Sequence, residues 1–219
     1  MSKFKGFIFD VDGTLTSTNK LIFASFNYVT KKYLNKTLTD EEVIALFGPP
    51  EDVILKEWFG DKFEEVQRDY YNFYEKNHNK LAKIFPGMKD ILKLIKKAKL
   101  PLSVFTGKGR KTTEITLKQL GIYDFFDMIV TGDDVRNHKP SAEGINMFLK
   151  KFNLPPGNVL MIGDAPSDIK AAREAGVKIA TVVWDSYAKD EVLQMQSDYV
   201  FHSVDELKKF IVHEIRHSS

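Results

Sequence analysis

The stretch KFKGFIFDVDGTLTSTN, residues 3–19, is the most informative for the fold. In it an apolar run, typical of a buried strand, ends at two acids. Residues 7–9 (FIF) are typical of a buried strand in a sheet that is covered on both faces. Asp10 and Asp12 follow, and we expect them where the strand emerges, since burying a carboxylate is costly. Side chains alternate along a strand, so both acids point the same way and Val11 points away. Two such charges repel unless a cation or a proton separates them, which predicts a charged site at this strand end.

Length and composition limit the classes of protein to which the chain can belong. Its 219 residues, 43% hydrophobic and 28% charged, are enough for a large globular domain with a core. The net charge is +2 with the signs mixed, which gives no argument for nucleic acid or for an anionic membrane. No cysteine is present, so disulfides and thiolate metal sites are excluded and a reducing compartment fits.

The hydrophobic segments predict no membrane span. The most apolar ones, NVLMIGDA and VKIATVVW, are too short to cross a bilayer. The first residues lead directly into the first expected strand, so we expect no signal peptide. We therefore expect a soluble, cytoplasmic protein; the sequence gives no indication of its oligomeric state.

Residues 15–84 predict helices and show no strand pattern. Apolar residues at helical spacing mark a first helix within 18–34. Thr39, with Glu42 three residues later, predicts a capping box, and the prolines of the turn Gly48–Pro49–Pro50 end that helix. A long amphipathic helix is expected within 61–83, with the following residues on its apolar face: Phe63, Val66, Tyr70, Phe73 and Asn77.

From residue 85 onward, expected helices and short apolar strands alternate. The expected strands are PLSVFT (101–106), FDMIVTGDD (126–134), NVLMIGD (158–164), VKIATVVW (177–184) and SDYVF (197–201). Such alternation predicts an α/β fold, a doubly wound parallel sheet with right-handed crossovers and helices on both faces. We therefore predict a catalytic core of residues 1–14 and 85–219 and an inserted helical cap of residues 15–84, with hinges near 15–17 and 84–87.

Polar side chains follow the expected strands at the points where the strands end. In open α/β sheets, ligands bind beyond the carboxyl ends of the strands, so these residues are the candidates for a site. They are Asp10, Asp12, Thr106, Lys139, Asp164 and Asp168. Carboxylates, a hydroxyl and a lysine at one edge suit Mg²⁺ and a phosphoryl group. An aspartate there can also act as a nucleophile that forms an acyl phosphate.

Four motifs in order, DVDGT, the threonine after PLSVF, the lysine before PSAEG, and GDAPSD, resemble those of the haloacid dehalogenase superfamily. The resemblance covers nearly the whole chain. Within the superfamily, the chain is most similar to phosphatases that have a small helical cap inserted after the first strand. Residues 18–29 and LFGPP are most similar to phosphoglycolate phosphatases and cap-bearing inorganic pyrophosphatases. Departures from the usual pattern are Ser17 and Thr18, where Asp and Ser are common, and Ala165, where a hydroxyl residue is common.

The resemblance implies the roles of the acids. Asp10 matches the nucleophile, which is also a metal ligand. Asp12 matches the general acid and base, and its backbone carbonyl matches a metal contact. Asp164 matches a metal ligand. Asp168 is expected among the metal ligands as well, either binding the ion directly or supporting Lys139, and the implied cofactor is Mg²⁺.

The resemblance also implies a phosphate site. Thr106 and the backbone of Gly107 match the phosphate-binding group, and Lys139 matches the lysine that neutralises nucleophile and phosphate. Residues 106–113 (TGKGRKTT) do not fit a nucleotide-binding P-loop, whose pattern of glycines and a following hydroxyl is missing. We interpret them as a turn into a helix N-terminus, where Lys108 or Arg110 helps to hold an anion.

The function expected from these features is a Mg²⁺-dependent phosphatase that forms an aspartyl phosphate. Its partner would be a small-molecule phosphate ester or pyrophosphate, neither a nucleic acid nor a membrane. Specificity residues are expected in the turn 48–51 and in the first cap helix at Asn19, Lys20 and Phe23; residues 184–187 (WDSY) are expected either at the pocket edge or in a structural role.

Other functions are weaker alternatives. A phosphosugar mutase of the same superfamily would usually carry a histidine near Ile22, and this helix has none. A dehalogenase needs no metal, which does not fit the acids of DVDGT and GDAPSD. A non-catalytic binder of phosphorylated ligands would normally have lost the nucleophile, and Asp10 is intact.

Overall fold

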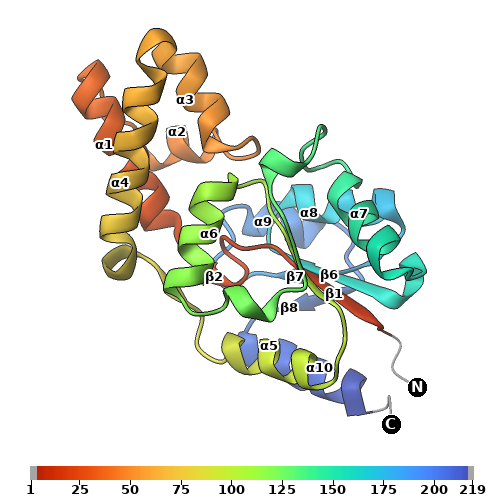
Figure 1. Ribbon diagram of the computed structural model, residues 1–219. Helices are drawn as coiled ribbons and strands as arrows, with labels where there is room; N and C mark the ends of the chain where they lie inside the picture. The colour runs from red at the N-terminus through yellow and green to blue at the C-terminus, as the bar shows by residue number, and fades with distance from the viewer. Residues whose placement is uncertain (1–3, 217–219) are drawn as a thin grey trace.

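The central sheet has six parallel strands in the order β5-β4-β1-β6-β7-β8 in the computed structural model, which describes residues 4–216 (Figure 1). The strands are β1 (Gly6–Phe9), β4 (Leu102–Phe105), β5 (Met128–Val130), β6 (Val159–Gly163), β7 (Lys178–Val182) and β8 (Tyr199–Phe201). This arrangement confirms the predicted α/β fold, and it places the first strand of the chain in the middle of the sheet.

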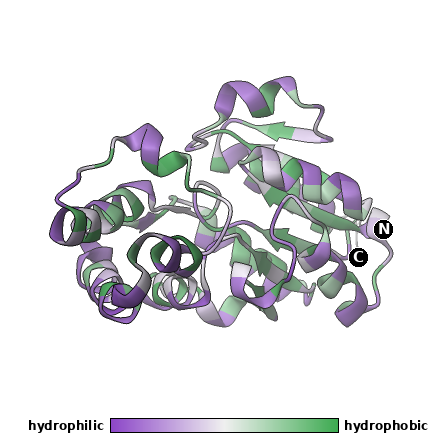
Figure 2. Ribbon diagram, turned by 90° about the horizontal axis from the view of Figure 1, so that it is seen from above, coloured by the Kyte–Doolittle hydropathy of each residue, from purple (hydrophilic) through white to green (hydrophobic). Residues whose placement is uncertain are grey.

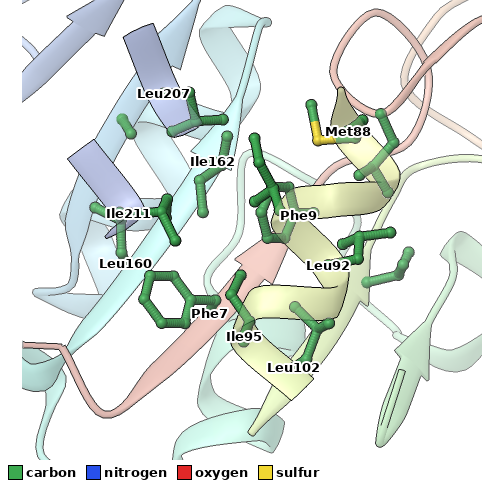
Figure 3. Packing of buried hydrophobic residues seen from close by; sticks show 14 of the residues in the cluster. Phe7, Phe9, Met88, Leu92, Ile95, Leu102, Leu160, Ile162, Leu207 and Ile211 are labelled. Carbon is green, nitrogen blue, oxygen red and sulfur yellow. The ribbon is translucent and has the colours of Figure 1, made fainter. Parts of the chain in front are cut away.

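Alternation along β1 divides the core into two layers. Phe7 and Phe9 pack into one cluster with residues from neighbouring strands and from helices on that face of the sheet (Figure 3). Ile8 points to the opposite face and packs into a second cluster. All three side chains are fully buried, so β1 is covered on both faces, as its continuous apolar run predicts.

Helices cover both faces of the sheet. The first cluster is completed by α5 (Met88–Lys97), α6 (Arg110–Gln119) and α10 (Val204–Arg216), and the second by α7 (Glu143–Phe152), α8 (Pro166–Ala175) and α9 (Lys189–Gln194). Hydrophobic residues concentrate on the strands and hydrophilic residues on the outer sides of the helices (Figure 2). No helix within residues 4–216 combines the length and apolar character needed to cross a membrane.

Four further helices lie together beside the sheet (Figure 1). They are α1 (Asn19–Leu34), α2 (Asp40–Ile44), α3 (Glu51–Phe59) and α4 (Phe63–Leu81). Their apolar faces form a third cluster, which also includes Ile115 of α6, so these helices pack directly on the sheet-bearing part. The capping box predicted at Thr39 and Glu42 is confirmed at the start of α2. We refer to α1–α4 as the cap helices.

The buried face of α4 differs from the predicted one. Its buried residues are Val66, Tyr70, Tyr74 and His78, whereas Phe73 and Asn77 are half-buried. The predicted face was wrong at its C-terminal end because Tyr74 and His78 are polar, yet both are hydrogen-bonded to Thr116 of α6 inside the interface. A pattern of apolar residues alone gives no weight to such paired polar groups.

The two connections to the cap helices pair with each other. Thr16–Ser17 (β2) and Lys83–Ile84 (β3) form a two-stranded antiparallel ribbon, so the expectation of no strand in 15–84 was wrong. Two-residue strands are too short to show alternation in a sequence. The ribbon ties together the segments that enter and leave the cap helices. The short helix α9 was likewise not predicted.

Candidate active site

Three neighbouring strands bring the predicted residues to one edge of the sheet. Asp10 follows β1, Thr106 follows β4 and Asp164 follows β6, and these strands are adjacent in the sheet. The backbone N–H of Asp10 donates to the carbonyl of Ile162 at 2.9 Å, which extends the strand pairing to the site. All three side chains are buried at this edge.

An acidic cluster lies at the centre of the edge. One carboxylate oxygen from each of Asp10, Asp164 and Asp168 lies within 4.8 Å of the others. Burial, opposed by Lys139, raises the pKa of Asp10 to about 7, and burial together with the charge of Asp10 raises the pKa of Asp164 well above its usual value. Buried carboxylates that are this close need a compensating cation, and an all-oxygen donor set fits Mg²⁺.

Lys139 lies within this acidic cluster. Its Nζ donates to Asp10 Oδ1 at 2.9 Å and to Asp168 Oδ1 at 2.5 Å. Burial alone would lower the pKa of Lys139, but the charges of Asp10 and Asp168 outweigh burial and hold this pKa above its ordinary value. The lysine is therefore a fixed positive charge beside Asp10.

Asp168 is fully engaged with protein groups. Beyond its contact with Lys139, its Oδ2 accepts the backbone N–H groups of Asp164 and Ala165, each at 3.1 Å. A side chain on Gly163 would collide with this carboxylate. Asp168 thus fixes the loop between β6 and α8 as well as the lysine.

Gly13 and Thr14 hold the carboxylate of Asp164. Gly13 has φ of +78°, and a Cβ there would collide with the Asp164 carboxylate, so this position needs glycine. The hydroxyl of Thr14 donates to Asp164 Oδ1 at 2.8 Å. The turn after β1 therefore fixes the position of the Asp164 carboxylate, which follows β6.

Asp12 has different partners from Asp10. Its Oδ1 accepts a hydrogen bond from the Thr18 hydroxyl, and its Oδ2 lies 3.3 Å from Lys108 Nζ. Its side chain keeps 18% exposure, more than the acids of the acidic cluster. Asp10 and Asp12 both line the same cavity, as the alternation along the strand predicts.

The loop after β4, which was predicted to bind phosphate and begins at Thr106, contacts the turn between α2 and α3. The Thr106 hydroxyl accepts the backbone N–H of Lys108 at 3.2 Å. A Cβ on Gly107 would lie 2.6 Å from the carbonyl oxygen of Gly48, so the close approach of loop and turn requires glycine at 107. The predicted phosphate loop and the predicted cap turn are thus in direct contact.

Glu51 joins the cap helices to the core. Its Oε2 accepts the backbone N–H of Gly109 at 2.8 Å, and its Oε1 accepts the hydroxyl of Thr112 at 2.7 Å. Lys108 Nζ lies 3.5 Å from Glu51 Oε1 and 4.9 Å from the centre of the Tyr74 ring. The buried ammonium of Lys108 therefore bridges Asp12 and Glu51.

The two predicted anion-binding side chains differ in position. Lys108 lines the cavity, and its Nζ, 3.3 Å from Asp12 and 3.5 Å from Glu51, is buried without a hydrogen-bond partner among the described residues. The guanidinium of Arg110 pairs with Asp134 and donates to the carbonyl of Ile129 at 3.1 Å. Arg110 is not among the residues that line the cavity, and an acid of the loop after β5 holds its guanidinium, so Lys108 is the better placed of the two alternatives.

The cavity lies between the sheet edge and the cap helices. Core residues that line it are Asp10, Asp12, Thr106, Gly107, Lys108, Lys139, Asp164, Ala165, Ser167, Asp168 and Tyr187. Cap residues that line it are Asn19, Ile22, Phe26, Leu46, Phe47, Gly48, Pro49, Glu51 and Ile54. Of the expected cap candidates, Asn19, Gly48, Pro49 and Glu51 line the cavity. Lys20 is exposed and lies outside the lining, and Phe23 packs against Phe47 with ring centres 6.3 Å apart.

The residues after β7 divide between the two roles considered for them. Tyr187 lines the cavity, and its ring packs edge-on against Phe47 at 5.3 Å. Trp184 packs against Phe85. Ser186 donates to the backbone carbonyl of Asp164 at 2.6 Å and so supports the loop after β6.

The contacts of Thr14, Thr18, Ser186 and Glu51 were missed in the sequence. The hydroxyl residues after DVDG were a visible signal, but the partner of Thr14, Asp164, lies 150 residues away, and no pattern indicated that Thr18 would turn back to Asp12. Glu51 was placed in the correct turn, yet no pattern indicated that it would bind Gly109 and Thr112.

Comparisons with known proteins identify related chains. The family of haloacid dehalogenase-like hydrolases matches residues 7–182. The chain is 32% identical over 200 residues to the pyrophosphatase PpaX of Bacillus velezensis, covering 91% of this chain and 93% of that protein. It is also 32% identical over 200 residues to the pyrophosphatase PpaX of Halalkalibacterium halodurans, with the same coverage.

Solved structures have the same fold. A protein from Haemophilus somnus, described as a predicted phosphoglycolate phosphatase, superimposes with a TM-score of 0.83 at 24% identity, over 96% of this chain and 99% of that one. At this identity the likeness shows the fold alone.

Proposed function

The chain belongs to the haloacid dehalogenase-like hydrolases and is a phosphatase, and from this premise we propose that it hydrolyses a small phosphorylated metabolite through an aspartyl phosphate on Asp10. One observation carries the proposal: Asp10 shares a buried sheet edge with Asp164 and Thr106 and lies 2.9 Å from Lys139 Nζ. A nucleophile, a phosphate-binding hydroxyl and a fixed positive charge are the groups that phosphoryl transfer requires.

In the first step a carboxylate oxygen of Asp10 attacks phosphorus. The bond from phosphorus to the leaving oxygen breaks, and Asp12 donates a proton to that oxygen. Lys139 and the backbone of Gly107 stabilise the charge on the phosphoryl oxygens, and the Thr106 hydroxyl orients them.

In the second step water attacks the aspartyl phosphate. Asp12, now ionised, takes a proton from the water, and the bond between phosphorus and the Asp10 oxygen breaks. Phosphate is released, and both aspartates return to their starting state. Thr18 and Lys108 hold Asp12 for both proton transfers.

The acidic cluster suits Mg²⁺. Asp10 and Asp164, with the backbone carbonyl of Asp12, would hold the ion, which when bound neutralises charge on nucleophile and phosphate. Asp168 was predicted among the ligands; because both of its oxygens already accept hydrogen bonds, we propose that it positions Lys139 and the loop after β6 instead.

We further propose that residues 15–84 act as a cap that closes over the core formed by residues 1–14 and 85–219. The contacts of Glu51 with Gly109 and Thr112, and of Gly48 with Gly107, hold the cap helices against the core beside the cavity. Opening of the cap would break these contacts, with the β2–β3 ribbon as the hinge.

Hydrolysis of inorganic pyrophosphate is the second candidate activity, favoured by the names of the PpaX relatives. A mutase is not proposed, because the apolar Ile22 lines the cavity where the phosphosugar mutases usually carry a histidine.

The test is phosphate release from a panel of phosphate esters and pyrophosphate, with Mg²⁺ and with EDTA. We expect metal-dependent release and, after acid quenching, a phosphorylated enzyme. Asp10→Asn should lower turnover by roughly 10³-fold or more and abolish the phosphoenzyme while the circular dichroism spectrum stays unchanged. Activity like that of the wild type in Asp10→Asn would contradict the covalent mechanism.

A further inference from the structure

Glu51 is a buried acid at the junction of the cap helices and the core. It is the first residue of α3 and is 6% exposed. Its Oε2 accepts the backbone N–H of Gly109 at 2.8 Å, and its Oε1 accepts the Thr112 hydroxyl at 2.7 Å, so it also lies at the start of α6. The N-termini of both helices favour a negative charge there, which offsets the cost of burying the carboxylate. Glu51 is therefore held as a fixed anion where the cap helices dock.

Two glycines of the loop after β4 make room for the turn that carries Glu51. A Cβ on Gly109 would lie 2.6 Å from Glu51 Oε2, and one on Gly107 would lie 2.6 Å from the carbonyl oxygen of Gly48. Neither of these two glycines has a positive φ. The backbone conformation therefore does not require glycine at either position, whereas the close approach of the turn does. The loop of the core is thus shaped to receive Glu51.

Lys108 connects Glu51 to Asp12, the general acid of the proposed reaction. Its Nζ is buried, 3.3 Å from Asp12 Oδ2 and 3.5 Å from Glu51 Oε1, and it has no hydrogen-bond partner among the described residues. The attraction of the two acids therefore sets its position, because charges at these distances interact strongly in a buried site. A displacement of Glu51 would change the position of the Lys108 ammonium.

Asp12 is held at both of its carboxylate oxygens. The Thr18 hydroxyl donates to Oδ1, and Lys108 Nζ lies beside Oδ2. The group beside Oδ2 is shared with Glu51, a residue of the cap helices. Without Glu51 in its docked place, Lys108 would keep Asp12 as a partner but lose the acid that fixes its other side. Glu51 can in this way determine how Asp12 presents its proton.

We propose that Glu51 is a positioning residue that, when docked on the core, holds Lys108 beside Asp12 and so makes proton transfer to the leaving group depend on the cap helices. This inference rests on the function proposed above. Glu51 itself exchanges no proton and forms no bond to phosphorus; the proton still passes from Asp12 to the leaving oxygen. The effect of Glu51 is therefore greatest for substrates whose leaving oxygen needs that proton.

Two substrates with different leaving groups test the inference. The oxygen that leaves ethyl phosphate must be protonated as it departs, whereas p-nitrophenyl phosphate releases a stable anion. In the full chain with Mg²⁺, Glu51→Gln should lower kcat/KM for ethyl phosphate by about fivefold or more and that for p-nitrophenyl phosphate by less than about twofold. A cap that was merely loosened would lower both values equally. Glu57→Gln, at an exposed position of the same helix, should change neither value.

A second variant, Gly109→Ala, displaces Glu51 without changing its charge. The new methyl group would meet the end of the Glu51 side chain, while the backbone at Gly109, with φ of −65°, accepts alanine without strain. We expect the same selective loss on ethyl phosphate as in Glu51→Gln. Gly157→Ala, where a Cβ would meet no atom within 4 Å, should keep both values of kcat/KM. Thermal melting identifies a variant that fails to fold.

A Lys108→Met background separates action through this lysine from any other role of Glu51. If Glu51 acts through Lys108, adding Glu51→Gln to Lys108→Met should change the ratio of the two kcat/KM values by less than about twofold. A larger change in that background would overturn the inference and leave the phosphatase function intact. An unchanged ratio in the folded Glu51→Gln and Gly109→Ala variants would do the same. No phosphate from these two substrates or from the panel described above, with the unchanged chain, would instead overturn the proposed function itself.

Discussion

Two buried lysines lie at the active-site edge, and their surroundings differ. Lys139 and its partners Asp10 and Asp168 all belong to the sheet-bearing part, and both contacts are hydrogen bonds, at 2.9 Å and 2.5 Å. Lys108 is equally buried, but its partners are split: Asp12 belongs to the core, and Glu51 to the cap helices. These contacts are longer, at 3.3 Å and 3.5 Å.

The difference indicates how the site is assembled. The Lys139 cluster is complete without the cap helices, so the groups that receive the phosphoryl group are preorganised. The Lys108 cluster is complete only when Glu51 is docked on the loop at Gly109. In the mechanism that we propose, the proton-transfer side, through Asp12, would therefore be coupled to docking of the cap helices, and the nucleophile side would not.

The strongest test of this difference is Lys139→Met. The variant leaves Asp10 and Asp168 buried without their cation, so we expect kcat to fall by roughly 10²- to 10³-fold and unfolding to become easier by about 3 kcal/mol. Because the phosphoryl group itself loses a stabilising charge, the loss should be similar for p-nitrophenyl phosphate and for an alkyl phosphate. Steady-state kinetics and thermal melting measure both effects.

Lys150→Met is the matched control, since Lys150 is exposed on α7. It should retain activity and melting temperature. If Lys139→Met kept its activity, Lys139 would have no part in phosphoryl transfer.

A smaller and more selective effect is expected for Lys108→Met. This lysine acts through Asp12, which matters most when the leaving oxygen needs a proton. We expect about a 10- to 50-fold loss of kcat with an alkyl phosphate but only a few-fold loss with p-nitrophenyl phosphate, whose leaving group departs without one. The ratio of the two rates, compared between Lys108→Met and Lys139→Met, separates the two clusters.

An equal loss on both substrates would refute the positioning role of Lys108. It would place Lys108 with Lys139, as a group that stabilises the phosphoryl oxygens directly.

The fold was predictable because its signals are local. Short apolar strands alternate with helices, and each strand of the sheet could be found from its own residues. The ribbon of β2 and β3 could not, since a two-residue strand gains its stability from the strand with which it pairs. The buried face of α4 could not either, because Tyr74 and His78 become suitable for the interior only when Thr116 supplies their hydrogen bonds.

The site residues that come directly after a strand could be predicted from the sequence. Asp10, Thr106 and Asp164 meet because parallel strands share one carboxyl edge. The partners of Lys108 and Arg110 depended on which acids lie nearest in space: Glu51, from a different part of the chain, and Asp134. No spacing in the sequence encodes that competition.

The smallest effect that we expect is a pH-dependent change in stability caused by His78. This residue of α4 contacts Thr116 of α6 and is influenced by the charge of Lys108. Burial and the charge of Lys108 lower the pKa of His78 below its ordinary value of 6.5, so the unfolded chain binds the proton first. The protein should therefore have the full stability contributed by neutral His78 above pH 6.5 and lose it as the pH falls below that value.

His78→Gln keeps a neutral polar group and removes the titration. The difference in melting temperature between wild type and His78→Gln should be constant above pH 6.5 and move against the wild type below it. His202→Gln, at an exposed position, should show no such change. In a Lys108→Met background the difference should shrink, because one of the two causes of the lowered pKa is gone. A pH-independent difference would mean that His78 has the same pKa in the folded and unfolded chain, and the interface of α4 and α6 would then have no part in the response of the protein to acid.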